Sequence, residues 1–220
     1  MKRRHLILVT VALAGCGYSD TGSGTRTLLA DVAGVYSPSN NVLDIEVDLS
    51  RGGAPTAGAS IRLADPDTKE LVELQPHAGG QNVARYTGEL SGYHRKLELA
   101  ISHADGAITA KLEAPSPHEI IEPLHGAIVR REDAGDNLEL RWRVADGVAA
   151  DEVRIELDDR AFDAEDTGKF SGVATSTVPS QRDPYGLAVT RTNRIALAGG
   201  VPASQFSLSY RTRSQFVLQE

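Results

Sequence analysis

The chain of 220 residues is poor in several residue types that commonly build folds and active sites. It has one cysteine, so an exported form has no partner for an internal disulfide. Aromatic residues make up 5% of the chain, which leaves few flat platforms for binding carbohydrate. Acidic residues outnumber basic ones by 30 to 23, and the net charge is -7. This balance excludes nucleic acid from the expected partners, because phosphate backbones recruit basic proteins.

Motifs that mark common active sites are also missing. The chain has no Gly-x-Ser-x-Gly nucleophile turn, no phosphate-binding glycine loop, no Cys-x-x-Cys pair and no His-Glu-x-x-His zinc motif. We therefore expect a protein that is not an enzyme and that uses no dissociable catalytic cofactor.

The amino-terminal segment has the parts of an export signal. Residues 2–4 form a basic region, and residues 6–14 form a mainly apolar run that is shorter than the roughly 20 residues needed to span a bilayer. Leu13-Ala14-Gly15-Cys16 resembles the lipobox of bacterial lipoproteins, which are cut just before a cysteine that carries diacylglycerol. The resemblance implies a signal peptide over residues 1–15 and lipidation of Cys16. An ordinary secretory signal with a chance cysteine is the alternative.

Anchoring follows from the same resemblance. A diacylated and N-acylated cysteine buries enough methylene groups to hold a protein on a membrane. Gly17 follows the cysteine, whereas Asp at that position retains enterobacterial lipoproteins in the inner membrane, so the resemblance implies the outer membrane. The folded part would face the periplasm or the outside. Residues 17–25 are small and polar apart from Tyr18, which predicts that residues 16–26 comprise the acylated cysteine and a flexible tether.

The rest of the chain alternates apolar and polar residues with a period of two. The alternation is complete over residues 43–49 and 138–144, which predicts half-buried strands. Shorter segments of the same kind are 61–63, 71–74, 83–87, 97–101, 108–112, 153–157, 187–190, 195–197, 206–210 and 216–218. Turn signals such as Gly199-Gly200 separate them, and no long segment has a helical period. The pattern predicts an all-β protein built from sandwiches or barrels.

A proline-rich segment, Glu113-Ala114-Pro115-Ser116-Pro117, predicts an extended linker. It divides the chain into residues 27–114 and 115–220, each about the size of one immunoglobulin-like sandwich. Two tandem immunoglobulin-like β-sandwich domains are therefore the expected architecture. A single jelly roll or barrel across residues 28–220 is the alternative.

Each half also resembles a known sandwich module. Residues 45–47, 53–63 and 86–90 are similar to the strands and turn of bacterial immunoglobulin-like surface modules. Residues 121–126, leading to 138–144, resemble the opening of a fibronectin type III-like or immunoglobulin-like domain, with Trp142 as the core tryptophan. These resemblances imply a fold and carry no function.

Three segments hold candidate ligand-binding side chains. His118, Glu119, Glu122 and His125 have the atom types of a metal site, but we expect an interdomain linker with solvated side chains here. Tyr185, in a strong turn, is the best candidate for a carbohydrate platform or else a loop staple. A cluster of carboxylates, expected to wrap calcium or to form a solvated loop, comprises Asp158, Asp159, Asp163, Glu165 and Asp166.

Two functional hypotheses follow. The first is a membrane-anchored lipoprotein of the cell envelope that acts as a non-enzymatic interaction or scaffold module for an envelope or surface protein. The alternative is a lipid-anchored receptor that binds calcium or a polysaccharide.

Overall fold

A computed structural model describes residues 23–24, 27–77, 84–104, 106–180 and 183–220. The regular secondary structure of its described part is almost entirely β, with one short helical turn and one 3-10 turn, which confirms the prediction of an all-β protein. The predicted signal peptide and Cys16 lie outside the described residues. Ser23 and Gly24 were expected in the flexible tether, but they form a short strand that pairs with residues 106–107.

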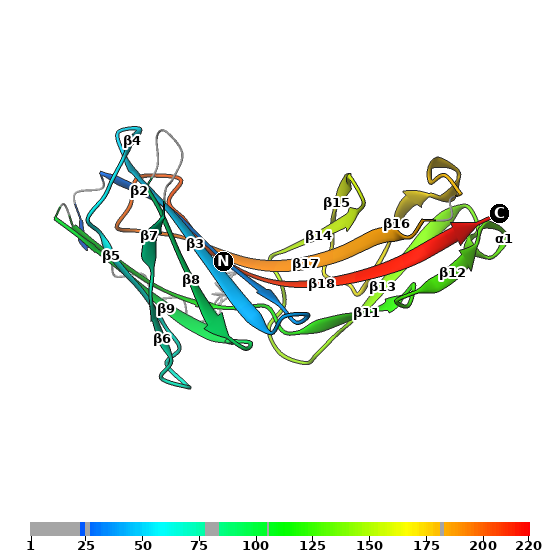
Figure 1. Cartoon of the computed structure of the whole chain (residues 1–220), viewed down its shortest axis with the longest axis horizontal. Helices are drawn as coiled ribbons and strands as arrows, with labels where there is room; N and C mark the ends of the chain where they lie inside the picture. The colour runs from blue at the N-terminus through cyan, green and yellow to red at the C-terminus, as the bar shows by residue number, and fades with distance from the viewer. Residues whose placement is uncertain (1–22, 25–26, 78–83, 105, 181–182) are drawn as a thin grey trace, which may run out of the picture.

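The strands are numbered in chain order as labelled in Figure 1. Those of the first half are β1 (Ser23–Gly24), β2 (Leu28–Ser37), β3 (Val42–Arg51), β4 (Ala54–Pro55), β5 (Ser60–Ala64), β6 (Leu71–Glu73), β7 (Gln75–His77), β8 (Ala84–Ser91), β9 (Lys96–His103) and β10 (Gly106–Glu113). The second half contains β11 (His118–Glu122), β12 (Ala127–Arg130), the helical turn α1 (Arg131–Ala134), β13 (Asn137–Val144), β14 (Glu152–Leu157), β15 (Arg160–Ala164), β16 (Lys169–Ala174), the 3-10 turn η1 (Thr175–Thr177), β17 (Tyr185–Ala196) and β18 (Gln205–Gln219).

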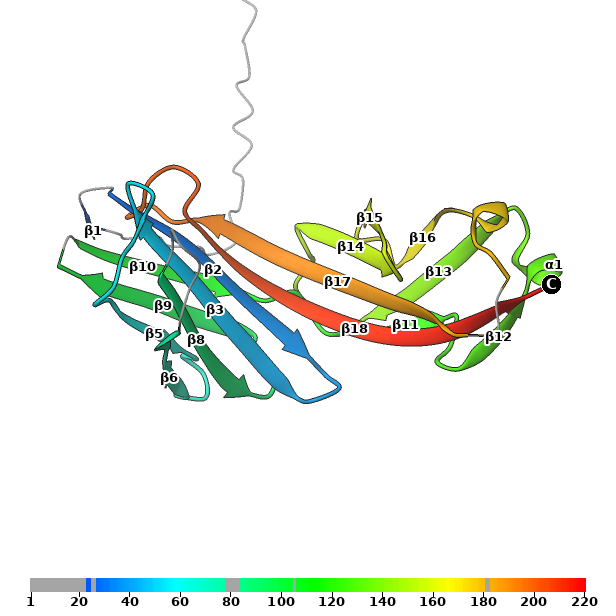
Figure 2. The same cartoon turned by 45° about the horizontal axis from the view of Figure 1, so that its top comes forward.

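The strands form one long sheet and two smaller ones. The long sheet has the order β15-β14-β17-β18-β2-β3-β8-β7, with β4 paired to β3 and β12 paired to β18. One smaller sheet has the order β1-β10-β9-β5-β6, and the other has the order β11-β13-β16. The two smaller sheets lie at opposite ends of the elongated molecule, with the long sheet running between them (Figures 1 and 2).

Period-two alternation decides which face of each strand is buried. In β3, Leu43, Ile45 and Val47 are buried whereas Asp44 and Glu46 between them are exposed. The same alternation holds along β13. Both strands contain the segments whose pattern was complete in the sequence, because a pleated strand sends successive side chains to opposite faces.

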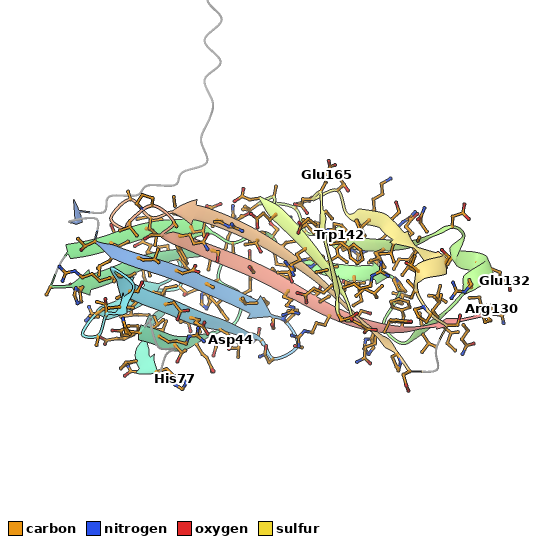
Figure 3. All side chains as sticks on the ribbon, turned by 90° about the horizontal axis from the view of Figure 1, so that it is seen from above. Asp44, His77, Arg130, Glu132, Trp142 and Glu165 are labelled. Carbon is orange, nitrogen blue, oxygen red and sulfur yellow. The ribbon has the colours of Figure 1, made fainter. Side chains whose placement is uncertain are left out.

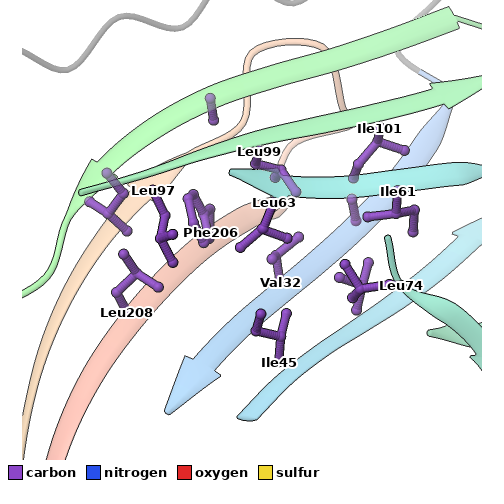
Figure 4. Close-up of a cluster of buried hydrophobic side chains, with 14 of the residues drawn as sticks. Val32, Ile45, Ile61, Leu63, Leu74, Leu97, Leu99, Ile101, Phe206 and Leu208 are labelled. Carbon is purple, nitrogen blue, oxygen red and sulfur yellow. The ribbon is translucent and has the colours of Figure 1, made fainter. Parts of the chain in front are cut away.

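Two hydrophobic cores result, one at each end of the long sheet. In the first, Ile61 and Leu99 from the five-stranded sheet meet Val32 and Ile45 from β2 and β3 (Figure 4). In the second, Trp142 from β13 packs with residues of β14, β16, β17 and β18. Trp142 is therefore a core tryptophan, as the resemblance of residues 121–126 and 138–144 to a sandwich module implied.

The hairpin of β17 and β18 contributes to both cores. The strands pair along 12 register positions, from Tyr185↔Phe216 to Ala196↔Gln205. Leu187 and Phe216 lie in the second core, whereas Phe206 at the other end lies in the first. At about 3.3 Å per residue, the 15 residues of β18 extend roughly 50 Å.

One edge of β18 pairs with β17, and its other edge changes partner along the strand. Residues 205–210 pair in parallel with β2, and residues 216–219 pair in parallel with β12. The pattern had predicted four short strands here, and the structure has two long ones. The tip of this hairpin packs in the first core, so the sequence boundary at residue 115 does not separate the side chains of the two cores.

Among the described residues, no helix has the length and apolar character needed to cross a membrane.

Candidate functional site

The junction between the two cores holds a buried charged pair. The Arg191 side chain, on β17, is 1% exposed, and its Nε and Nη2 atoms donate to the two Asp166 carboxylate oxygens at 2.8 and 2.6 Å. Its Nη1 donates to the backbone oxygen of Ser116 at 2.5 Å. Burial opposes ionisation of Asp166, but the hydrogen bonds from Arg191 and from the Ala150 N–H lower its pKa below the ordinary value.

His118 lies beside this pair and is buried as well. Its Nε2 is 3.1 Å from the Val189 oxygen and 2.9 Å from the Thr212 hydroxyl, and its ring lies 5.1 Å from the Tyr210 ring. Burial, with the positive charge of Arg191, lowers the pKa of His118 to about 4. The imidazole is therefore neutral at pH 7. The expectation of a solvated linker is wrong here, because His118 is 5% exposed.

Three tyrosines complete the junction. Tyr36, Tyr93 and Tyr210 pack with ring centroids 5.1 to 5.7 Å apart. The Tyr93 hydroxyl donates to the Pro115 oxygen at 3.0 Å, and burial raises the pKa of Tyr93 to about 12. These contacts hold the proline-rich linker against the hairpin. The junction residues are bonded to one another and to the linker backbone, so they support the fold.

The histidine-rich segment does not form one site. His118 points into the junction, while His125 lines a separate hollow of about 280 Å³ on the outer side of β14, β17 and β18. Glu119 and Glu122 are exposed and form ion pairs with Arg143 and Arg141. Within the described ranges, no group of three or more His, Cys, Asp or Glu side chains is placed to hold a metal ion.

The predicted acidic cluster is dispersed by the β14–β15 hairpin. Asp158 and Asp159 occupy its turn, where the Asp158 Oδ1 accepts a hydrogen bond from the Gly186 N–H at 2.6 Å. Asp163 lies on β15 opposite Arg154, and Glu165 and Asp166 follow the strand at its other end. The structure therefore does not bring the five carboxylates around one point, and calcium binding stays a prediction without a formed site.

Tyr185 is not an exposed platform. Its side chain is at the start of β17 and is 6% exposed, and its ring stacks on Phe216 with centroids 5.7 Å apart. Its hydroxyl donates to the Pro179 oxygen at 2.5 Å. Tyr185 therefore holds its loop against the core, which is the loop staple given above as the other interpretation. The turn signal before Tyr185 did not show that its side chain points inward.

The best candidate for a binding surface was not predicted. At the end of the molecule that carries α1, a hollow of about 550 Å³ lies between β12, β13 and the segment after β11. We call it the distal groove; it is lined by residues 121–124, 127–130, 133–134, 137–139 and 141. Arg130 and Glu132 mark this end of the molecule in Figure 3.

Exposed apolar side chains converge on the distal groove. Ile121, Leu124 and Ile128 are 38%, 64% and 62% exposed, and all three line it. The described residues contain one other large hydrophobic side chain in this class, Leu71 on β6, at 58%. Single exposed apolar residues are ordinary on a protein surface, whereas several in one hollow mark an interaction site.

Backbone groups on one wall of the distal groove lack a strand partner. β11 follows β13 only as far as the pair Glu122↔Arg141, so within the described chain the stretch 137–140 has a neighbouring strand on the β16 side alone, where the register shifts between Leu138 and Leu140. The Trp142 N–H donates to the Gly168 oxygen on the β16 side. The Asp136 oxygen, on the other side of Glu139, also bonds on the β16 side, to the Thr175 N–H, and the burial of β13 alternates regularly along its length. Because successive residues of such a strand alternate direction, the N–H and C=O groups of Glu139 face the open side.

The charges around the distal groove are predominantly acidic. Arg141 is shared between Glu122 and Glu139, and Arg130 pairs with Glu132 at 3.8 Å. Asp133, on α1, has no ion-pair partner among the residues that the structure describes. The four carboxylates of Glu122, Glu132, Asp133 and Glu139 thus outnumber the two arginines beside the apolar surface.

Comparison with known protein families and with curated proteins found no match to this chain.

Proposed function

We propose that the protein is a lipid-anchored lipoprotein of the outer membrane that acts as a non-enzymatic interaction module, with the distal groove as its contact surface. The observation that carries the proposal is the convergence of Ile121, Leu124 and Ile128, three exposed apolar side chains, in one hollow. A soluble surface seldom gathers such residues unless a partner covers them.

The proposal includes two immunoglobulin-like sandwiches. Its support in the second half is that β11-β13-β16 form one sheet, while β15, β14, β17, β18 and β12 belong to the other. The first strand segment of this sandwich is divided between the two sheets. β11 pairs with β13 in one sheet, and β12 pairs in parallel with the last strand, β18, in the other. Two facing sheets with the core between them are also what the sandwich interpretation requires of the first half.

The position of the distal groove suits a tethered protein. β1, the first described strand, lies at one end of the long axis (Figure 2), and β12 and α1, which contribute residues to the groove, lie at the other end with the C-terminal end of β18 (Figures 1 and 2). An anchor at Cys16 would therefore hold the molecule by the end remote from the groove. The hairpin shared by both cores favours a stiff connection between the anchor and the contact surface.

Site-specific photo-crosslinking in intact cells tests the proposal. A photoreactive residue at position 128 of the full lipidated chain should give one discrete crosslinked product with an envelope protein. The same residue at position 71, on an exposed apolar site of the first half, is the matched control and should not give it. Leu124→Glu should abolish the product by placing a charge in the groove. A product equally strong from position 71, or none from position 128, would overturn the proposal.

A further inference from the structure

We propose that the distal groove binds an extended segment of a partner protein, which adds as a strand to the open edge of β13. This inference rests on the proposed function and specifies the kind of partner that the same surface takes. It follows from three properties of the groove: its unpaired backbone groups, its apolar surface and its excess of carboxylates.

The backbone of β13 sets the geometry of the bound segment. The stretch 137–140 has β16 on one side and no strand of the described chain on the other, where β11 has already turned away. The Glu139 N–H and C=O are therefore available for a ladder with an incoming strand. An open edge of this kind is a template for a further strand, and edge addition is a recurring mode of peptide recognition.

The apolar side chains set the pattern of the partner. A strand sends alternate side chains to one face, so every second residue of the bound segment would face Leu124 and Ile128. These side chains are 64% and 62% exposed, and contact with an apolar residue removes that surface from water. A partner with apolar residues at alternate positions fits this groove better than a uniformly polar one.

The charges of the groove favour one kind of residue at the end of the bound segment. Glu122 and Glu139 already share Arg141, and Arg130 already has Glu132. Asp133 remains available at the end of the groove closed by α1. A lysine or arginine at one end of the segment would supply the missing positive charge, and the reverse charge would be repelled.

The test uses the lipidated full chain in nanodiscs and a fluorescent eight-residue peptide of alternating valine and threonine with a terminal lysine. Fluorescence anisotropy should show saturable binding. A peptide with proline at two central positions cannot donate the same ladder bonds and should bind at least tenfold more weakly. Replacing the terminal lysine by glutamate should also weaken binding severalfold.

Matched variants of the protein locate the bound strand. Glu139→Pro removes the open-edge N–H and should weaken binding about tenfold relative to Glu139→Ala, which keeps it. Ile128→Ser should weaken binding, whereas Leu71→Ser should not. Thermal unfolding checks that each variant is folded. If Glu139→Pro is unfolded, methylation of alternate backbone nitrogens of the peptide makes the same comparison on the wild-type protein.

The outcomes separate this inference from the proposed function. Equal binding of the valine–threonine peptide and its proline form, or no saturable binding by either, would overturn strand addition. A partner that still crosslinks at position 128 in that case would leave the interaction module standing with a folded ligand. Crosslinks between two copies of this chain at position 128 would replace the foreign segment by self-association.

Discussion

Arg191 is the residue on which the junction between the cores depends most. It occupies an inward position of β17, where an apolar residue would be expected, and its charge is balanced by Asp166. Removing one member of a buried ion pair leaves the other without compensation, which typically costs about 3 to 5 kcal/mol. Exposed ion pairs are typically worth less than about 1 kcal/mol, because water screens them.

We predict that Arg191→Ala lowers the free energy of unfolding by about 3 to 5 kcal/mol, because Asp166 and the Ser116 oxygen lose their donor. Urea denaturation of the purified protein measures the change. Arg194→Ala is the matched control on the same strand, where an exposed pair with Glu152 is worth less than about 1 kcal/mol. Equal losses in the two variants would contradict the role assigned to Arg191.

His118 should make stability depend on pH. Burial lowers its pKa to about 4 in the folded protein, against 6.5 for an ordinary histidine. Between these values the unfolded chain binds a proton that the folded chain does not, so stability is complete above pH 6.5 and falls as the pH drops toward 4. Asp166 adds a loss in the same direction at lower pH, since its pKa is lowered in the folded state.

The expected loss from His118 between pH 7 and pH 5 is about 2 kcal/mol, at about 1.4 kcal/mol per pH unit below the unfolded pKa. His118→Gln removes the titrating group while keeping a hydrogen-bonding side chain. Urea unfolding at the two pH values should therefore show a shallower pH dependence in this variant. An unchanged slope would mean that another group controls the acid response.

At the scale of elements, the shared hairpin should couple the two cores. Phe206 on β18 is fully buried in the first core, whereas Trp142, the single tryptophan of the chain, reports on the second. The strands between them form one uninterrupted ladder. Loss of packing in the first core, at one end of the hairpin, should therefore also destabilise the second core at the other end.

We predict that Phe206→Ala destabilises the protein by about 3 to 5 kcal/mol and shifts the denaturation midpoint reported by Trp142 fluorescence. Leu71→Ala, at an exposed apolar position of the first half, should leave that midpoint unchanged. If Phe206→Ala left the tryptophan transition in place while the first core unfolded early, the halves would be independent domains.

The sequence predicted most individual strands and missed how two of them continue. Residues 187–190 and 206–210 followed the apolar alternation, but the inward positions between the cores are occupied by Arg191, Asn193 and Thr212. These buried side chains form hydrogen bonds with the linker and with Asp151, Asp166 and His118. One example is the 2.9 Å bond from the Asp151 N–H to Asn193 Oδ1. A pattern based on hydrophobicity ends where polar residues take inward positions.

At the scale of the whole molecule, we expect the proposed membrane anchoring to be separable from folding. Cys16→Ser should release the protein from membranes, because the lipobox resemblance assigns the acyl chains to that sulfur. Fractionation of cells followed by detection of the protein measures the change. The circular dichroism spectrum should stay that of a β protein, since the described residues that form the two cores begin at Leu28. A variant that still sediments with membranes would contradict lipid anchoring at this residue.

The distal groove also belongs to this scale, and no motif in the sequence pointed to it. Ile121, Leu124 and Ile128 are apolar residues of three different segments, and each alone is unremarkable on a surface. They meet because the chain leaves β13 after residue 122 and joins β18 as β12. Pairing between strands distant in sequence created the hollow.

The sequence alone determined the β class, the inward residues of strands such as β3 and β13, and the core position of Trp142, because alternation along a strand is a local property. Tertiary structure alone decided that the last hairpin serves two cores, that His118, Tyr185 and Arg191 are buried, and that the acidic cluster is dispersed. It also assembled the distal groove. These features depend on which strand lies beside which, and such pairing is not encoded within any one segment.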